Sequence, residues 1–460
     1  MSERFPGGFI TKTPIVPTTS SASGVWTLDQ AMGYIKSGTW PTPPDYWAVL
    51  ISNFTPFGYS IRIDSSQNIY VASQVTTGGV GSIAYLKLTK AGSVANQNDY
   101  SYGNTHNGGD IALDSSGNVV LLSTAGSGNY PPCYPLMLDS SFNVLKGYGI
   151  SASGNNSCNG TYLACDSSGN TYIAGSTYSG SSGLTRGAFF KVSSGGALSF
   201  SVAYSTAYGA YAGCATVDSS GGPYIGGGIQ NASFNTEFQM SKWTTAGAIT
   251  WTKTLAYSYV CCCVTIDYSY CLGINVSPNG NVIGVGNFRF GSYQAVIVAY
   301  NSSGTLQWQR RITNSGSSFS GVATDSSNNI YAVGTGDGSG VLIVKYNSSG
   351  TIQWQRSITG GSLAGAYGIT IDSTDNCMLI YAQNPTNMIF RLPTDGSHTG
   401  SFTISGTTYT YAASSFTGAS GILNGSSNNP SATSFSAASI GTSTPTKNTN
   451  SASTTTKASV

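Results

Sequence analysis

The chain has 460 residues, of which 40% are hydrophobic and only 8% are charged, and its formal net charge is +2. Such a chain can build a large core, and the absence of a strongly basic balance argues against nucleic acid as a partner. Residues 1–12 lack the apolar stretch of a secretory signal, and no apolar run is long enough to cross a membrane. We therefore expect synthesis in the cytoplasm and no membrane insertion.

Residues 1–45 form a short arm in front of the repeats that fill most of the chain. Thr27 and Gln30 have the spacing of a capping box, and the apolar residues around them fall on one face of a short helix. Gly38 and Pro41 end this helix. An arm of this size cannot build its own core, so we expect it to dock on another surface.

One phrase returns seven times along the chain: an apolar stretch, Asp-Ser-Ser-Gly-Asn or a variant of it, and a second apolar stretch. Its first residue stands at Asp64, Asp114, Asp166, Asp218, Ser277, Asp325 and Asp372. The spacing of about 50 residues is typical of one four-stranded propeller blade. The pattern predicts an all-β fold, a single seven-bladed β-propeller over residues 46–414.

The repeated phrase looks like a calcium loop, but it lacks the alternating carboxylates and the closing Glu of such loops. An Asp that opens a turn, followed by a Gly or Asn that tolerates positive φ, is typical of a hairpin. In the sixth repeat, residues 325–329 separate residues 320–324 from residues 330–334, whose alternation indicates strands. We therefore interpret the turn aspartates as structural.

An open ring would leave two unpaired strand edges. Trp47 precedes Asp64 by the same number of residues as the outer-strand Trp308 precedes Asp325. Residues 47–51 therefore have the pattern of an outer strand without a blade of its own. The seventh repeat ends without a matching Trp. We expect residues 47–51 to complete the last blade, with residues 401–404 as the competing candidate.

Tryptophan recurs at one position of the repeat, as in Trp251, Trp308 and Trp354. Such rings can stack on sugars, but their recurrence favours packing between blades. Ligand sites in propellers arise where repeats differ, and here polar inner-strand residues, Tyr-rich loops and a Pro-Pro-Cys-Tyr turn depart from the pattern. The candidate binding residues at these places are Arg62, Tyr134, Tyr208, Tyr211, Tyr259 and Asn275.

The sequence offers no motif for catalysis, for a metal or for a cofactor. Nine cysteines at irregular spacings indicate mostly small buried residues, and only two of the three in the run 261–263 can share a strand face. The chain has two histidines and no nucleophile elbow, phosphate loop or zinc signature. We expect no enzyme, no metal and no cofactor, with paired carboxylates from distant blades as the catalytic alternative.

Residues 415–460 are rich in Ser, Thr, Asn and Ala and have almost no large apolar side chain. Such a segment cannot bury enough apolar surface to offset its ordering entropy. We expect a low-complexity tail that becomes ordered only on a partner's surface.

The repeats themselves resemble a known family. Phrases such as residues 321–331 and 345–354 resemble the bacterial seven-bladed propeller repeats called SBBP, and this resemblance spans residues 46–405. It implies a fold and brings no catalytic residues.

The opening segments 5–12, 22–30 and 38–41 resemble a leader of virion proteins from marine and cyanobacterial tailed phages. This resemblance implies a tail, fibre or capsid-surface protein of the virion, for assembly and host-surface attachment. Its partners would be other virion proteins, contacted through both termini, copies of this chain, and a host-surface glycan or protein. The residues expected to dock the arm are Phe5, Phe9, Trp26, Leu28 and Trp40. The alternatives are an envelope polysaccharide lyase or hydrolase and a free lectin-like adhesin.

Overall fold

The computed structural model forms two compact units, residues 1–45 and residues 46–460. The described residues are 29–30, 33, 46–52, 55–77, 80–101, 106–125, 132–152, 159–179, 183–256, 268–290, 292–336, 340–383, 387–420, 424–425, 431–434, 437–442, 446–448 and 455–459. In the first unit, Asp29, Gln30 and Gly33 are helical, which agrees with the predicted helix. Thr27 and the five expected docking residues lie outside the described residues.

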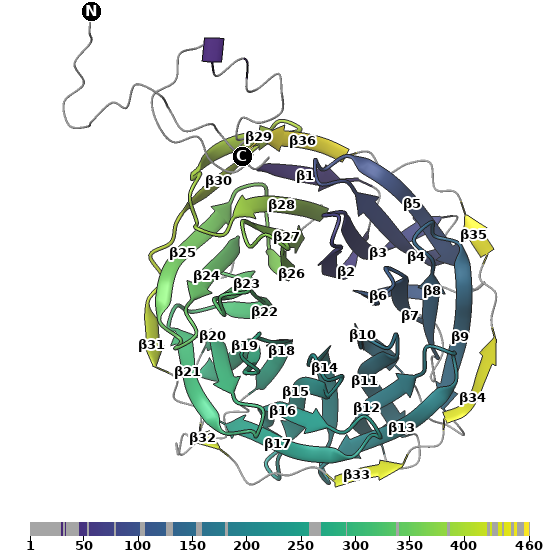
Figure 1. The fold of residues 1–460 in the computed structure, drawn as a ribbon. Helices are drawn as coiled ribbons and strands as arrows, with labels where there is room; N and C mark the ends of the chain where they lie inside the picture. The colour runs from purple at the N-terminus through teal and green to yellow at the C-terminus, as the bar shows by residue number, and fades with distance from the viewer. Residues whose placement is uncertain are drawn as a thin grey trace, which may run out of the picture. The chain divides into compact units, whose positions relative to one another are not determined.

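Seven antiparallel sheets stand around a central axis as the blades of one ring (Figure 1). Each blade has four strands from the repeats, and its two faces pack against the neighbouring blades through buried side chains. The predicted all-β, seven-bladed propeller is thus confirmed. Within the described residues, no helix has the length and hydropathy needed to cross a bilayer.

Each blade has its first strand at the channel and its fourth strand at the outside of the ring. The first strands are β2 (Thr55–Ile63), β6 (His106–Leu113), β10 (Asn159–Cys165), β14 (Ala210–Val217), β18 (Ser269–Val276), β22 (Ser318–Thr324) and β26 (Gly365–Ile371). The second strands are β3 (Ile69–Thr77), β7 (Val119–Ala125), β11 (Thr171–Ser179), β15 (Pro223–Gln230), β19 (Val282–Phe290), β23 (Ile330–Thr335) and β27 (Cys377–Gln383). The third strands are β4 (Val80–Leu88), β8 (Cys133–Leu138), β12 (Leu184–Val192), β16 (Thr236–Trp243), β20 (Ser292–Tyr300), β24 (Val341–Tyr346) and β28 (Asn387–Pro393). The fourth strands are β5 (Val94–Ser101), β9 (Val144–Ala152), β13 (Leu198–Ser205), β17 (Ile249–Ala256), β21 (Leu306–Ile312), β25 (Ile352–Thr359) and β1 (Trp47–Ile51).

The ring closes between the two ends of the repeat region. β1 pairs with β28 and places Trp47 opposite Arg391, so the N-terminal strand completes the seventh blade as predicted. The competing segment forms β29 (Gly400–Ile404), which makes a hairpin with β30 (Thr407–Ala413). Because β30 pairs with β25, this hairpin widens the sixth blade, and the alternative closure is wrong.

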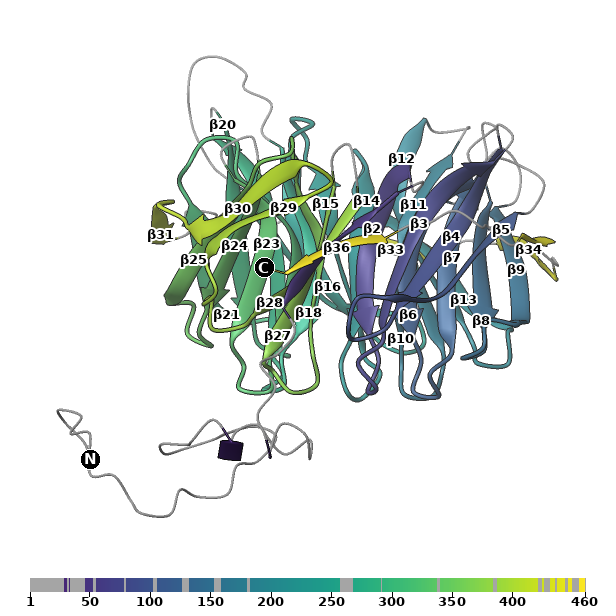
Figure 2. The same cartoon turned by 90° about the horizontal axis from the view of Figure 1, so that it is seen from above.

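Beyond β30 the chain runs back around the ring and adds one strand to the outer edge of each other blade (Figures 1 and 2). We name these six strands the belt. They are β31 (Gly418–Ser420), β32 (Asn424–Gly425), β33 (Ser431–Ser434), β34 (Ala437–Thr442), β35 (Thr446–Asn448) and β36 (Thr455–Ser459), paired with β21, β17, β13, β9, β5 and β1.

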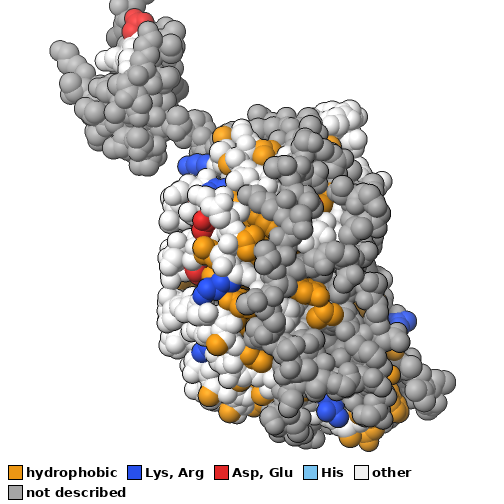
Figure 3. Space-filling model, turned by 90° about the vertical axis from the view of Figure 1, so that its right-hand side faces the viewer, with side chains coloured by type: hydrophobic (Ala, Val, Ile, Leu, Met, Phe, Trp, Pro, Cys, Tyr) orange, Lys and Arg blue, Asp and Glu red, His pale blue; other side chains and the backbone are white. Residues whose placement is uncertain are grey.

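The belt corrects the expectation of a tail that only a partner can order. That expectation considered side chains alone, whereas the fourth strand of a blade offers a row of backbone donors and acceptors to any segment that lies beside it. On the side of the ring in Figure 3, the described Lys and Arg side chains are scattered among uncharged ones and form no continuous band.

Because the strands of a blade alternate in direction, the two ends of the ring differ. The connections between first and second strands and between third and fourth strands lie on one face, which we name the turn face. The connections between second and third strands and the links from blade to blade lie on the opposite loop face.

The repeated phrase forms a tight hairpin on the turn face. At Asp325 the backbone N–H donates to the Asn329 carbonyl at 3.0 Å, and Asn328 adopts a φ of 65°. The Asp325 carboxylate accepts hydrogen bonds from the Asn329 backbone at 2.8 Å and from the Tyr331 hydroxyl at 3.0 Å. The turn aspartates are therefore structural, as predicted.

In four blades a lysine of the third strand covers the tyrosine that bonds to this aspartate. The ammonium lies 5.0–5.1 Å from the ring centroid in the pairs Lys87–Tyr70, Lys191–Tyr172, Lys242–Tyr224 and Lys345–Tyr331. In the seventh blade Leu379 replaces the tyrosine, since it pairs with Arg391 as Tyr331 pairs with Lys345. Arg391 reaches Asp372 directly at 3.1 Å with both side chains buried. The aspartate keeps a partner in each of these five blades.

An aromatic residue of the fourth strand joins most neighbouring blades. The Trp308 indole donates to the Ser348 carbonyl at 2.9 Å, and a Cβ at Gly350 would lie 2.5 Å from the indole ring. Trp251 and Gly304 repeat this contact. The interpretation of these tryptophans as packing between blades is confirmed.

At the junction of the first and second blades, the aromatic residue lies in the facing turn instead of on the fourth strand. Asn96 pairs with Lys87 as Trp354 pairs with Lys345, so it takes the tryptophan position. Phe142 stands at the glycine position of the facing turn, with a φ of 67° and a ring centroid 4.3 Å from that of Tyr85. The aromatic side chain that β5 lacks at this position is supplied by the facing turn of the second blade.

Candidate functional site

The main candidate site is a pocket on the loop face where the third, fourth and fifth blades meet. Its volume is about 330 Å³. The lining residues come from the ends of β12, β14, β15, β16 and β18 and from the connections beside them: Gly183, Leu184, Thr185, Tyr208, Gly209, Ala210, Tyr211, Gly228, Gln230, Phe234, Thr236 and Tyr270. Small-molecule sites usually measure about 300 to 1,000 Å³, so this pocket suits a small ligand or one end of a longer one.

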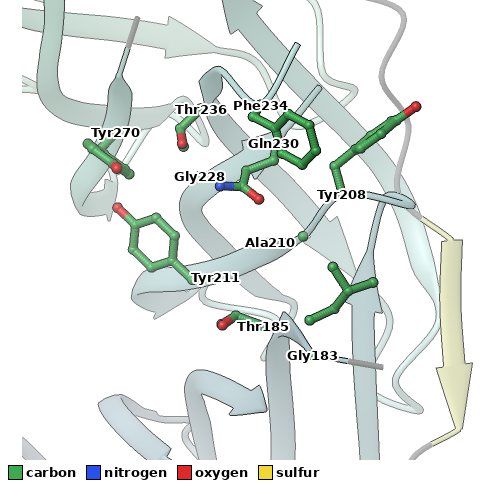
Figure 4. A pocket seen from close by; sticks show the side chains of 12 residues that line it. Gly183, Thr185, Tyr208, Ala210, Tyr211, Gly228, Gln230, Phe234, Thr236 and Tyr270 are labelled. Atoms are coloured by element: carbon green, nitrogen blue, oxygen red, sulfur yellow. The ribbon is translucent and has the colours of Figure 1, made fainter. Parts of the chain in front are cut away.

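Four aromatic rings form two pairs in the pocket (Figure 4). The Tyr211 and Tyr270 rings meet edge to face at 5.2 Å, and the Tyr208 and Phe234 rings meet in the same way at 5.6 Å. A Cβ at Gly228 would lie 2.6 Å from the Tyr211 ring, so glycine leaves the room in which this ring lies. Apolar ring surface is thus available on two sides of the pocket.

Gln230 supplies the amide of the pocket and lies between the two ring pairs (Figure 4). Its backbone is held on both sides, since its N–H donates to Gly209 at 3.0 Å and its carbonyl accepts from the Thr206 hydroxyl at 2.6 Å. A Cβ at Gly209 would lie 2.8 Å from the Gln230 side-chain oxygen. Among the described residues, the side-chain amide has no hydrogen-bond partner, and it can therefore offer a donor and an acceptor to a ligand.

The pocket is electrically neutral at ordinary pH. Burial, together with the neighbouring Tyr270, raises the pKa of the Tyr211 phenol. Burial also raises the pKa of Tyr270, against the smaller opposite effect of its hydrogen bond with Thr236. Of the lining residues described, none carries a carboxylate, an ammonium, a guanidinium or an imidazole.

Phe234 is the most exposed large hydrophobic side chain among the described residues, at 61%. It occupies the fourth place of a five-residue turn in which Phe234 N–H donates to Asn231 and Asn231 N–H donates to Asn235. Its φ is 59°, a left-handed conformation that Gly304 adopts in the turn of similar sequence between β20 and β21 on the turn face. Packing inside the ring therefore does not explain why a large apolar residue stands here.

The structure separates the residues that the sequence singled out. Tyr208 and Tyr211 line the pocket together, whereas Tyr134 lies on β8 near Gly149 and does not line it. Tyr259 lies outside the described residues.

Arg62 and Asn275 lie in the central channel, at its end on the turn face. The cavity there measures about 520 Å³ and is lined by the ends of the first strands. Arg62 forms an ion pair with Asp110 at 3.5 Å, and Asn275 accepts a hydrogen bond from the Thr324 hydroxyl at 3.0 Å. Both polar groups thus have partners inside the ring, and the predicted set of binding residues does not form one site.

Sequence reasoning missed Gln230, Phe234, Thr236 and the pairing of Tyr270 with Tyr211. Phe234 carries a signal that was available: Asn-Ala-Ser-Phe-Asn at residues 231–235 has the form of Asn-Ser-Ser-Gly-Thr at residues 301–305, with Phe in place of Gly. The other residues had no such signal, because Gln230 and Thr236, paired within the fourth blade, meet Tyr270 of the fifth blade only when the two blades pack together.

Metal-binding groups are absent from the described part of the chain, where no three His, Cys, Asp or Glu side chains form a cluster. The run at residues 261–263 lies outside it. Five described cysteines are free, and four of them are buried. Cys214 and Cys271 lie with their sulfurs 3.7 Å apart between the fourth and fifth blades.

Comparisons with known proteins identify no family for this chain. No protein-family model matches the chain, and no curated protein matches it either. A chain in a crystal structure of a mitotic checkpoint complex is similar, with a TM-score of 0.48 and 12% sequence identity. The similarity covers 83% of this chain and 100% of that chain. Function must therefore be argued from the residues of this chain.

Proposed function

We propose that this protein is a structural component of a bacteriophage particle, in the tail, a fibre or the capsid surface, and that it contacts the host surface. The observation that carries the attachment role is the asymmetry of the ring. The turn face repeats one hairpin from blade to blade, whereas the loop face gathers the pocket and the exposed aromatic residues Tyr178, Phe234 and Tyr293. Exposed aromatic groups of this kind are characteristic of recognition surfaces.

The virion assignment rests on the leader-like segments 5–12, 22–30 and 38–41. In this proposal residues 1–45 dock on another virion protein, and the propeller of SBBP type is displayed with its loop face toward the host. The neutral pocket favours binding over polysaccharide cleavage, since the described lining residues supply no general acid or nucleophilic carboxylate.

Mass spectrometry of purified particles tests this proposal. The chain is expected in particles at a fixed copy number per particle. A variant that lacks residues 1–45 is expected to fold and to be missing from particles. If the full chain were absent from washed particles, or if the shortened chain were incorporated equally well, the proposal would be wrong.

A depolymerisation assay separates attachment from the enzymatic alternative. Full-length protein is incubated with envelope polysaccharide of a host strain, and the size of the polysaccharide is followed by gel filtration. We expect no change in size; a time-dependent decrease would instead support a lyase or hydrolase.

A further inference from the structure

We infer that the loop-face pocket binds a short, uncharged saccharide. This inference rests on the proposed attachment function, and it specifies the chemistry of the ligand. Four properties of the pocket lead to it: its ring surfaces, its free amide, its neutrality and the conformation of Phe234.

The ring pairs match the shape of a pyranose. A sugar ring presents a flat face of C–H groups, which packs favourably on aromatic side chains, and a rim of hydroxyl groups. Tyr211 with Tyr270 and Tyr208 with Phe234 provide such surfaces on the two sides of the Gln230 side chain (Figure 4). A ligand with only apolar surface would leave this amide buried without a partner, which is costly.

Gln230 and the threonines match the rim of hydroxyls. The amide has an acceptor oxygen and two N–H donors, and this combination pairs with neighbouring sugar hydroxyls, each of which both donates and accepts. Thr185 and Thr236 lie on the wall of the same pocket and add hydroxyl groups. The pocket thus combines a few polar groups with a mostly apolar lining, as ligand sites commonly do.

The absence of charged side chains among the described lining residues favours neutral over acidic saccharides. Recognition of sialic acid, uronic acid or phosphate groups normally uses Arg, Lys or a cluster of N–H donors. The nearest charged chain neighbours, Arg186 and Glu237, follow Thr185 and Thr236 directly, and successive side chains of a strand point to opposite faces. Glu237 is also held by Asn231 at 3.0 Å.

Phe234 gives the second, independent reason for a ligand. A left-handed backbone costs about 1–2 kcal/mol for a residue other than Gly, and here the ring remains 61% exposed. Strained conformations of this kind are often found where function needs them. At this edge of the pocket the ring is positioned to cover a bound sugar.

The test uses the full-length chain and a printed array of oligosaccharides. One half of the array carries neutral hexose and N-acetylhexosamine oligomers, and the other half carries sialylated and uronic-acid oligomers. We expect retention on neutral glycans, and saturation-transfer NMR with the best-bound of them should show contacts from aromatic protons. Q230A, Y211A and F234G should each weaken binding of that glycan about ten-fold or more.

Leu145→Ala is the control, because Leu145 is a large hydrophobic residue with 47% exposure that lies next to a hairpin of the turn face and does not line the pocket. Its binding should equal that of the unchanged chain, and thermal melting should show that all variants are folded. Retention on acidic glycans alone, on no glycan, or equally by Q230A would overturn the inference. Presence of the chain in particles without glycan binding would leave the proposed virion role standing and refute only the saccharide ligand.

Discussion

On the turn face a similar hairpin returns from blade to blade, with an aspartate in six of the seven blades and a lysine–tyrosine pair in four, whereas on the loop face almost nothing returns. Phe142 and Phe234 make the difference concrete. Both occupy the left-handed position of a five-residue turn, with φ values of 67° and 59°. Phe142 on the turn face is 1% exposed and fills the space beside Asn96, while Phe234 on the loop face is 61% exposed.

The same strained backbone conformation has a different role on each face. For Phe142 the cost of a left-handed backbone is offset within the ring by contacts with Tyr85 and Tyr70. For Phe234 the described contacts are with Tyr208 at the edge of the pocket. The turn face thus stabilises the ring, and the loop face is where binding is proposed.

The largest effect is expected at Trp47, the residue of the closing strand that reaches the turn face. Its side chain is fully buried, and its indole donates to the Lys90 carbonyl at 3.1 Å. Trp47→Ala should lower the free energy of unfolding by about 3–5 kcal/mol, as measured by chemical denaturation. Leu306→Ala, at a residue with 41% exposure, is the control and should change little. Equal melting of W47A and the unchanged chain would refute closure by β1.

A double-mutant cycle tests whether Asn96 and Phe142, between the first and second blades, occupy the positions of Trp308 and Gly350. Phe142→Gly alone should cost about 3 kcal/mol, because it empties a buried site. Asn96→Trp alone should also destabilise the ring, because the new indole would meet Phe142. The two changes together restore the arrangement of Trp308 and Gly350 and should recover most of the loss. Simple addition of the two losses, measured in the same denaturation series, would show that the positions are not equivalent.

Removal of the belt should leave the turn face and the loop face in place, because the belt strands pair with the outer edges of the blades. A chain that ends at Thr417 loses the pairings of β31 to β36, whose hydrogen bonds contribute about 1 kcal/mol each net and are largely offset by ordering entropy. We expect a smaller decrease in melting temperature than for W47A. The freed edges of β1, β5, β9, β13, β17 and β21 should also give concentration-dependent association, measured by light scattering. A shortened chain that stays monomeric would contradict this role of the belt.

Asp218, one of the turn aspartates, should make stability depend on pH. Burial alone raises the pKa of Asp218, but hydrogen bonds from Ser220 and Gly222 and the charge of Lys242 outweigh it, so the pKa is lowered overall. The stabilisation is therefore fully present above the ordinary carboxyl pKa of about 4 and is lost as the pH falls through the lowered value. Asp218→Asn should be less stable at neutral pH and should lose less on acidification. Parallel pH profiles of the free energy of unfolding would exclude this contribution.

The smallest effect is expected at Phe234 and has the opposite sign. Phe234→Gly relieves a left-handed conformation and removes a mostly exposed ring, so it should raise the free energy of unfolding by about 0.5–1 kcal/mol. The same substitution at Phe142 destabilises, and the pair measured side by side distinguishes the two faces. A loss of stability in F234G would mean that the Phe234 side chain packs as part of the propeller core.

Much of the fold was decided by local sequence. Asp325 with Asn328 and Asn329 specifies its turn from within five residues, because an aspartate side chain bonds to backbone two and four residues ahead. The repetition of this turn, with strand-like alternation between copies, was enough to predict seven blades. The offset of Trp47 from Asp64 likewise identified the strand that closes the ring.

Three features were decided only by tertiary structure. The belt depends on strand edges that exist once the blades have formed, so the composition of residues 415–460 could not reveal it. The division of the candidate residues depends on strand direction, which places Arg62 at one end of the ring and Tyr211 at the other. The pocket joins Gln230 to Tyr270 across two blades, and no pattern within one repeat records which side chains of its neighbours will face it.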